Sequence, residues 1–544
     1  MIMLQDITRR YGDRFVLNGT SFHFPTKGRV ALVGVNGAGK TTLLNIICKL
    51  DEPDSGQMIQ PKSCILGYLP QEPNPTPEAT LLQECMASAT DLNTLRHDLE
   101  AALVEMGEDY SDALYARYEK LEHAFRDQGG YALEAEAKSI LVGLGFKPSQ
   151  FDMDPSLLSG GWRMRLELAR IFIRKPNFLV LDEPTNHLDL PSMMWLETYL
   201  MNFDGTLLLV SHDQELLNRL SNTTLHLQAG KLTAYAGNFD AFLQQYELKK
   251  MQSTHGAKQM AAQQAHIEKF IERFRGKPSK AAQVRSRYKM LGRLQALEQN
   301  TPEQEEDAAM SLNLPLKIKS GVHVLKVEAA SIGYNENVLA KRVNLEIKRG
   351  QKVAIIGANG IGKSTLLKSI VGDSPFLAGM CEQGHQVKLG YYAQNQMDTL
   401  DANLTVLDNV MKAREALSLQ EARRILGCFL FTRDDVFKPF KVLSGGEKSR
   451  VGLAHLLAQE CNFLLLDEPT NHLDMMSTNI LANSLSEFEG TVLFVSHNRA
   501  FINAVATHIF AMTPDGRSQL FEGNLDDYVH LCERSGFPNV LKAG

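Results

Sequence analysis

Apolar runs stand at matching places in the two halves of the chain. Residues 30–33 and 353–356 each lead into a glycine-rich loop and then into an apolar helix start, so each predicts a strand, a loop and a helix. Residues 178–181 and 463–466 are apolar at every position, which is typical of strands buried on both faces of a sheet. The pattern therefore predicts two α/β domains of the same kind.

Both glycine-rich loops fit the pattern G-x-x-x-x-G-K-[ST], in which backbone N–H groups at a helix N-terminus surround phosphate oxygens. The lysine of this pattern neutralises the outer phosphates, and the hydroxyl after it binds magnesium. The candidate phosphate-binding residues are Gly34, Asn36, Gly37, Ala38, Gly39, Lys40, Thr41 and Thr42 in the first copy and Gly357, Asn359, Gly360, Ile361, Gly362, Lys363, Ser364 and Thr365 in the second. Two matches in the same setting predict a protein with two nucleotide sites.

Matched residues outside the loops define an internal repeat. Upstream pairs lie 323 positions apart and downstream pairs lie 285 apart, so the first copy holds 38 extra residues. The pairs are Tyr11 with Tyr334, Gly34 with Gly357 and Gln71 with Gln394, then Ser159 with Ser444, Asp182 with Asp467 and His212 with His497.

The extra residues lie within about residues 81–146. Apolar residues at helical spacing over 92–106 and 114–125, on either side of a break at 107–111, predict a helical hairpin that projects from the first domain. Thirteen acidic and five basic side chains lie between Glu84 and Lys138. Most such charge runs are solvated helix faces; if this arm has a partner, a basic protein surface suits it better than a phosphate backbone.

Residues 247–310 join the two domains and carry the opposite charge. Apolar residues at helical spacing on both sides of a break at 276–279 predict a second helical pair. One acid, Glu272, stands among nine basic residues, namely Lys269, Arg273, Arg275, Lys277, Lys280, Arg285, Arg287, Lys289 and Arg293. A soluble linker usually mixes both signs, so this imbalance favours contact with a nucleic-acid backbone over a plain spacer.

Each copy also contains the other parts of a phosphoryl-transfer site, in the same order. An aspartate at the end of the fully apolar run would hold Mg²⁺, and the glutamate after it would orient and deprotonate the attacking water. A histidine after the next strand would contact the γ-phosphate, and a glutamine would sense that phosphate and the metal. The catalytic candidates are Glu183, Glu468, His212 and His497, and the metal ligands are Thr41, Gln71, Asp182, Ser364, Gln394 and Asp467. Tyr11 and Tyr334 either stack on adenine or only pack against a strand.

Composition limits the remaining possibilities. The 544 residues exceed one core, and the net charge of −6 gives no overall reason to expect a nucleic-acid partner. The seven cysteines form no C-x-x-C pair, no apolar run reaches the roughly 18 residues of a membrane span, and the first residues do not resemble a signal peptide, so we expect a cytoplasmic protein without membrane contact. The expected domains are 1–246 with an arm at 81–146, a linker at 247–310, 311–530, and a short tail at 531–544.

These motifs in this order resemble those of the ATP-binding cassette ATPases, whose signature is the Ser-Gly-Gly doublet. The resemblance implies two cassettes that face head to tail within one monomer, so that each ATP lies between one phosphate loop and the other domain's signature. The signature residues are Ser159, Gly160 and Gly161 in the first cassette and Ser444, Gly445 and Gly446 in the second. No catalytic position is missing, so both sites are expected to hydrolyse ATP with Mg²⁺. The next residue is Trp162 in one copy and Glu447 in the other, which could make the two rates unequal.

Within that superfamily the chain resembles the ABC-F proteins. Asp-Glu-Pro-Thr-Asn-His-Leu-Asp occurs at 182–189 and at 467–474, beside an arm and a basic linker, and residues 159–165 and 273–287 look like the bacterial YheS-like group. Members of that group often carry a C-terminal coiled coil, whereas this chain stops at Gly544.

The resemblance to ABC-F proteins implies a ribosome-bound ATPase that acts on elongation or on stalled ribosomes. The linker would reach the E site, towards ribosomal RNA and the P-site tRNA, and the arm would meet a basic ribosomal protein. ATP binding would close the cassettes and hydrolysis would release them. A DNA-structure-binding ATPase and an ATPase subunit of a membrane transporter remain open, although a transporter has no evident use for the cationic linker.

Overall fold

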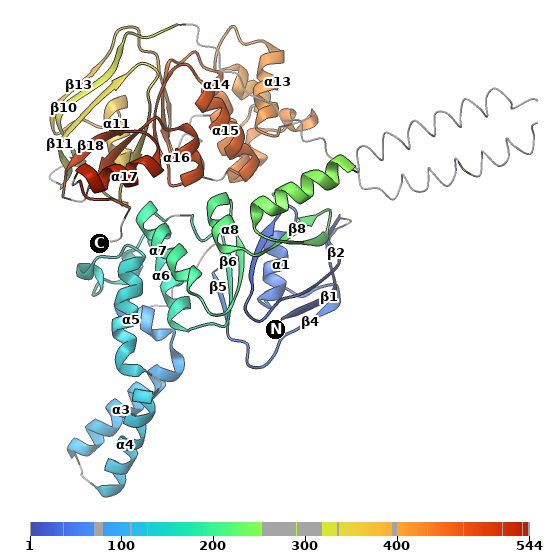
Figure 1. The fold of residues 1–544 in the computed structure, drawn as a ribbon, viewed down its shortest axis with the longest axis vertical. Helices are drawn as coiled ribbons and strands as arrows, with labels where there is room; N and C mark the ends of the chain where they lie inside the picture. Colours follow the sequence, from blue (N-terminus) through green and yellow to red (C-terminus); the bar gives the residue numbers. More distant parts are fainter. Residues whose placement is uncertain are drawn as a thin grey trace, which may run out of the picture.

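The fold is taken from a computed structural model of the chain. It describes residues 2–12, 14–35, 37–69, 80–108, 111–127, 129–186, 188–252, 290, 318–334, 337–393, 400–431, 433–471, 473–513, 515–535 and 537–541. Figure 1 shows two α/β domains, one above the other, with a helical arm that extends away from the first domain. The nine basic residues predicted to bind RNA lie outside the described residues.

The first cassette contains two sheets. The antiparallel sheet has the order β2-β1-β4, from β1 (Met3–Tyr11), β2 (Arg14–His23) and β4 (Ser55–Ile59). The larger sheet has the order β5-β6-β7-β3-β8-β9, from β3 (Arg29–Val33), β5 (Leu66–Leu69), β6 (Phe178–Asp182), β7 (Thr206–Val210), β8 (Thr223–Gln228) and β9 (Lys231–Ala236). All of its neighbouring strands are parallel except β8 and β9.

The second cassette repeats this plan, which confirms the predicted tandem α/β fold. Its antiparallel sheet has the order β11-β10-β13, from β10 (His323–Tyr334), β11 (Asn337–Lys348) and β13 (Ala378–Gln383). Its larger sheet has the order β14-β15-β16-β12-β17-β18, from β12 (Lys352–Ile356), β14 (Leu389–Tyr392), β15 (Phe463–Asp467), β16 (Thr491–Val495), β17 (His508–Met512) and β18 (Ser518–Glu522).

Apolar strands and helices form the core of each cassette. β6 and β15 are buried at every position, as their uninterrupted apolar sequences predict. In the first cassette, the helices that follow the repeated motifs are α1 (Lys40–Ile47), α6 (Gly160–Ile173), α7 (Leu190–Met201) and α8 (Gln214–Leu220). Their counterparts in the second are α11 (Lys363–Val371), α14 (Gly445–Ala458), α15 (Met475–Glu487) and α16 (Arg499–Val505). The carboxyl ends of the parallel strands therefore carry the loops that precede these helices.

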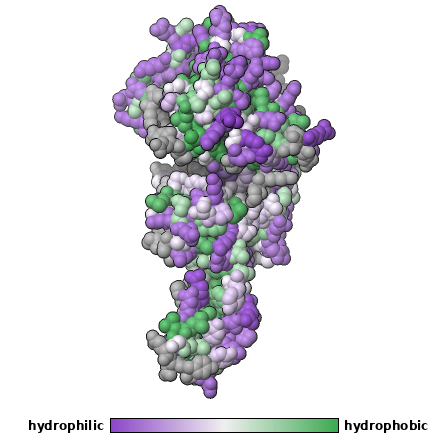
Figure 2. Space-filling view, turned by 90° about the vertical axis from the view of Figure 1, so that its left-hand side faces the viewer, coloured by the Kyte–Doolittle hydropathy of each residue, from purple (hydrophilic) through white to green (hydrophobic). Residues whose placement is uncertain are grey.

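The arm is a hairpin of α3 (Thr90–Glu108) and α4 (Asp112–Asp127), with a break where the sequence predicts one. Its flanking helices, α2 (Leu81–Ala87) and α5 (Gly130–Gly143), contact α6, just as α12 (Val406–Met411) and α13 (Leu419–Cys428) contact α14 in the second cassette. The projecting part is therefore residues 90–127, as many residues as the excess of the first copy. The space-filling view shows this narrow projection and a patch of hydrophobic residues on it (Figure 2).

The end of the chain belongs to the second cassette. Helix α17 (Leu525–Ser535) continues past residue 530, and both Val540 and Leu541 are buried in the apolar core. The hydroxyl of Tyr528 accepts a hydrogen bond of 3.2 Å from the backbone N–H of Val540. Residues 531–535 and 537–541 thus form part of the domain, although the sequence suggested a separate tail.

Apolar side chains cross in both directions between the two cassettes. Leu190, the first residue of α7, is buried in the core of the second cassette. Met475, the first residue of α15, packs against the core of the first cassette. The two residues are 285 positions apart, so the contact follows the internal repeat. Within the part of the chain that is described, no helix combines the length and apolar character needed to cross a bilayer.

Candidate active sites

We call the site at the phosphate loop of the first cassette the first site, and that at the loop of the second cassette the second site. The second site is a cavity of about 560 Å³ between the two cassettes. The first cassette contributes Ser159, Gly161, Trp162, Arg165, Thr185 and Leu188 to its walls. The second contributes Tyr334, Leu339, Asn359, Gly360, Gly362, Lys363, Ser364, Thr365, Glu468, Asn471, Val495 and His497. The cavity therefore brings one phosphate loop together with the signature of the opposite cassette, the head-to-tail arrangement that the resemblance implied.

The phosphate loop of this site leaves room for an anion at the start of α11. Gly360 and Gly362 have φ angles of 81° and 100°, in the left-handed region that favours glycine, and a Cβ on Gly360 would meet no atom within 4 Å. Helix α11 has no side-chain cap, so its first N–H groups remain available to a ligand. Lys363 Nζ donates to the carbonyls of Gly357 at 2.9 Å and Ala358 at 3.0 Å.

A hydroxyl and a carboxylate lie side by side in each cassette. Ser364 Oγ donates to Asp467 Oδ1 at 3.0 Å, and Thr41 Oγ1 donates to Asp182 Oδ2 at 3.4 Å. Burial raises the pKa of Asp182 to about 6 and also raises the pKa of Asp467. These oxygen pairs fit Mg²⁺, which takes one or two protein oxygens and completes its shell with phosphate and water.

The two candidate catalytic glutamates share an unusual backbone conformation. Glu183 and Glu468 both have a φ of 50°, which is uncommon for a residue with a side chain and is typical of functional sites. Both carboxyl groups are buried, and burial raises the pKa of each to about 7. Among the described residues, neither oxygen of Glu468 and only one oxygen of Glu183 has a hydrogen-bond partner. These carboxylates can therefore accept a proton from a water molecule in the site.

The candidate histidines lie next to these glutamates. His497 Nε2 is 3.1 Å from Glu468 Oε1, and His212 Nε2 is 3.4 Å from Glu183 Oε1. Burial, helped by the lysine of each site, lowers the pKa of His497 to about 3 and that of His212 to about 4. Both imidazoles are therefore neutral at pH 7, and each has one N–H group to donate.

The two signature serines begin helices but make different contacts. Ser444 forms a capping box with Glu447, in which Ser444 Oγ donates to Glu447 Oε2 at 2.7 Å. Ser159 makes no side-chain cap on α6, and Trp162 at the position of Glu447 cannot supply the return bond of a capping box. The Trp162 ring instead packs against Phe146 at 4.9 Å between centroids. The Ser159 hydroxyl is thus not held by its own helix, whereas that of Ser444 is.

One pair of site residues was not identified from the sequence. Asp189 Oδ2 accepts a hydrogen bond of 2.8 Å from the backbone N–H of Asn359, across the cassette interface. Arg165 Nη1 lies 3.8 Å from the other oxygen of Asp189, and both side chains are buried. Asp189 ends the repeated Asp-Glu-Pro-Thr-Asn-His-Leu-Asp motif, and that repetition was the available signal. Its counterpart Asp474 lies 3.3 Å from Arg450 Nη1.

The two tyrosines are exposed, so neither is a packing residue of the core. Tyr334 is 52% exposed, lines the cavity, and accepts a hydrogen bond from Thr365 Oγ1 at 3.4 Å. Tyr11 is 55% exposed and donates to Asp51 Oδ2 at 3.3 Å. The exposure of both rings favours the adenine-stacking interpretation over packing.

The first site is more open than the second. Lys40 Nζ donates to Gly34 O at 2.8 Å, as its counterpart does, but Lys40 is half-buried where Lys363 is buried. The His212 side chain is 30% exposed, against 19% for His497. Asp474 of the second cassette is close enough for its charge to act on the pKa of Lys40, which burial lowers. Asn36, Gln71 and Gln394 lie outside the described residues.

Comparisons with known proteins find a cassette in each half of the chain. A family model described as ABC transporter matches residues 17–186 and 340–471, and a second model with the same description matches 225–312. The chain is 36% identical over 543 residues to the putative ATP-binding protein YdiF of Bacillus subtilis, with 98% of this chain and 83% of that one covered. It is 34% identical to the probable ATP-binding protein YheS of Escherichia coli K12, with 97% and 81% covered. It is 33% identical to the human ATP-binding cassette sub-family F member 3, with 98% and 75% covered.

Solved structures share the two-cassette fold. The RNase-L Inhibitor superposes with a TM-score of 0.61 at 17% identity, over 98% of this chain and 93% of the other. An archaeal ribosome recycling factor, solved in complex with the archaeal ribosomal stalk protein aP1, superposes with a TM-score of 0.59 at 18% identity, over 97% and 92%. At these identities the likeness concerns the fold alone.

Proposed function

The chain belongs to the ABC-F family of ATP-binding cassette proteins, and from this premise we propose that it is a ribosome-associated ATPase with two composite active sites. The observation that carries the ATPase part is the cavity in which Lys363, Glu468 and His497 of one cassette face Ser159 and Gly161 of the other. Hydrolysis of ATP is what the cassette domains imply. The use of two composite sites and the ribosomal role are the proposal.

In the second site each residue has a part that follows from its position. The N–H groups at the start of α11 and the Lys363 ammonium bind the β- and γ-phosphates. Ser364 and Asp467 hold Mg²⁺, which when bound neutralises charge on those phosphates. The Ser159 hydroxyl and the N–H groups at the start of α6 complete the γ-phosphate site from the opposite cassette, and Tyr334 stacks on adenine.

Glu468 acts as the general base for the attacking water. A pKa near 7 suits a base that must be deprotonated before the reaction and must hold a proton after it. The neutral His497, beside Glu468, donates its N–H to the γ-phosphate. Because this imidazole carries no positive charge, it does not lower the pKa of Glu468. In the first site Lys40, Thr41, Asp182, Glu183 and His212 take the same parts, with Ser444, Gly445 and Gly446 from the second cassette.

Closure of the cassettes connects ATP to the rest of the molecule. ATP is bound by both cassettes, so its binding energy favours the closed state, and its hydrolysis removes that preference. We propose that closure sets the angle of the linker on the ribosome. The nine basic residues of the linker contact ribosomal RNA and the P-site tRNA. The acidic arm contacts a basic ribosomal protein.

The test is ribosome binding by the trapped ATP state. The double variant Glu183→Gln, Glu468→Gln binds ATP without hydrolysing it, and is expected to sediment with ribosomes in ATP and not in ADP. The matched control exchanges two glutamates outside the sites, Glu328 and Glu489, for glutamine, and should release as the unaltered protein does. If the trapped protein stays off ribosomes in ATP, or prefers branched DNA in competition, the ribosomal role is wrong.

A further inference from the structure

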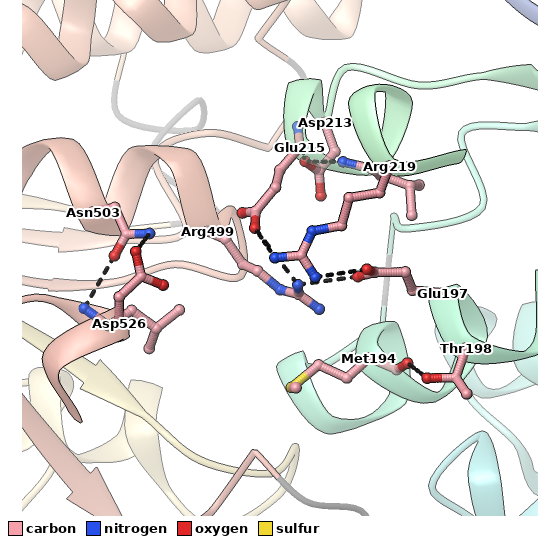
Figure 3. Close-up of polar contacts among 11 residues, drawn as sticks. Met194, Glu197, Thr198, Asp213, Glu215, Arg219, Arg499, Asn503 and Asp526 are labelled. Carbon is pink, nitrogen blue, oxygen red and sulfur yellow. Dashed lines mark hydrogen bonds and ion pairs between the residues drawn. The ribbon is translucent and has the colours of Figure 1, made fainter. Parts of the chain in front are cut away.

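An ionic cluster with the buried Arg499–Glu197 pair at its centre joins the two cassettes on one side of their interface. Arg499, on α16 of the second cassette, places Nη1 3.0 Å from Glu197 Oε2 and 3.9 Å from Glu215 Oε1 of the first cassette (Figure 3). Arg219 also contacts Glu197, at 2.7 Å, and Glu215. The buried Asp213 adds a third negative charge nearby. The first cassette thus presents three carboxylates and one arginine, and Arg499 supplies a second positive charge from the opposite cassette.

The matching place on the other side of the interface has no such cluster. Residues 285 positions from Glu197, Glu215 and Arg219 are alanines, and the one from Arg499 is a glutamine; they are Ala482, Ala500, Ala504 and Gln214. All four line a cavity of about 190 Å³ between α8, α15 and α16. The internal repeat therefore joins the cassettes by an ionic cluster on one side, and the equivalent positions on the other side line a cavity.

The ionic side belongs to the second site. Arg499 follows His497 by two residues, and Glu197 lies on α7, the helix that begins after Asp189. His497 and Asp189 are both residues of the second site, where Asp189 accepts from Asn359. The cluster thus links the start of α16, next to His497, to α7, which begins after Asp189. Separation of the cassettes at the second site must break it.

We infer that Arg499 is a positioning residue that holds the second ATP site closed, so that the first site opens and exchanges nucleotide before the second. This inference rests on the proposed ATPase function and adds an order to it. Opening the second site separates Arg499 from Glu197 and leaves Glu197, Glu215 and Asp213 with Arg219 alone. The attraction between Arg499 and these carboxylates therefore opposes opening. Among the described residues, no ion pair at Gln214 opposes opening on that side.

The test measures nucleotide release from one site at a time in the full chain. Glu468→Gln traps radiolabelled ATP in the second site, and Glu183→Gln traps it in the first. After a chase with unlabelled ATP, Arg499→Ala is expected to speed release about tenfold or more from the E468Q protein, because a buried ion pair is lost. Release from the E183Q protein should change much less. Gln214→Ala, the matched control at the equivalent position, should speed neither.

Two further variants separate positioning from folding. Arg499→Lys should restore slow release in part, because both contacts of Arg499 run through the single atom Nη1. Glu197→Gln removes the opposite charge from α7 and should repeat the R499A pattern, which serves where the alanine variant is unstable. The inference is overturned if R499A speeds both sites alike, or if it behaves as Q214A does. Failure of both glutamine variants to trap ATP would instead contradict the proposed ATPase function.

Discussion

The backbone N–H of Asn359 and the Asp189 carboxylate meet at 2.8 Å, although they belong to different cassettes. Asn359 lies in the phosphate loop, so this hydrogen bond fixes the loop only while the cassettes are closed. Arg165, 3.8 Å from the same carboxyl group, holds Asp189 from within its own cassette. The phosphate loop of the second site therefore has this hydrogen bond only when the first cassette is docked against it.

Removal of this hydrogen bond should slow hydrolysis in the second site. We expect Asp189→Ala to lower kcat about tenfold or more, since a hydrogen bond to a charged group contributes about 1.5–3 kcal/mol. The measurement is ATPase activity in the Glu183→Gln background, where the second site alone turns over. Asp189→Asn, which keeps an oxygen acceptor for Asn359 but loses the charge that faces Arg165, should lie between. Equal activity of D189A and the unaltered chain would remove Asp189 from the site.

Burial of the catalytic glutamates should appear in the pH dependence of stability. Burial raises the pKa of Glu468 to about 7, from an ordinary value of 4.5. Because the folded pKa is the higher one, this group favours folding fully below pH 4.5, and its contribution is lost as the pH rises through 7. Glu468→Gln cannot ionise, so it should be more stable than the unaltered chain by about 1–3 kcal/mol at pH 8, with a difference that shrinks towards pH 4.5.

Urea unfolding at pH 5, 6, 7 and 8 gives this difference directly. The matched control is Glu487→Gln, which changes an exposed glutamate on α15 and should show no such dependence on pH. A constant stability gap between E468Q and the unaltered chain across this range would mean that the carboxyl group is not buried as described.

Loss of the capping box at the second signature should lower both the stability of the chain and the activity of the first site. Glu447→Ala removes the partner of Ser444, and we expect a loss of about 1 kcal/mol of unfolding free energy. Glu421→Ala removes an equivalent box with Ser418 at the start of α13, away from both sites, and should lose a similar amount. Only E447A should change ATPase activity in the Glu468→Gln background, because only Ser444 belongs to the first site. Parallel activity changes in the two variants would show an effect of stability alone.

The internal repeat explains which features of the fold and the sites could be predicted from the sequence. The loops around Lys40 and Lys363, the buried strands before Glu183 and Glu468, and the presence of a helical hairpin follow from local pattern and constant offset. The predicted arm of 81–146 was too wide, because α2 and α5 pack on α6 as part of the cassette. The contact of Asp189 with Asn359 depends on how two folded domains dock, and no local pattern contains that information. The φ of 50° at both glutamates is likewise imposed by the surrounding fold, since a glutamate has no preference for it. The difference between Arg499 and Gln214 is visible in the repeat. Only the docked cassettes show that Arg499 contacts Glu197 across the interface.

The exchanged apolar side chains should stabilise the closed pair of cassettes. Leu190 is only 1% exposed and lies in the core of the opposite cassette, so Leu190→Ala should lower the free energy of unfolding by about 2–5 kcal/mol. Met475 is half-buried at the equivalent position, and Met475→Ala should have a smaller effect. Calorimetry of the full chain measures both losses. Addition of ATP should recover part of the L190A loss, because nucleotide bound between the cassettes favours the same closed state. A variant that loses stability equally with and without ATP would show that Leu190 supports its own cassette rather than the interface.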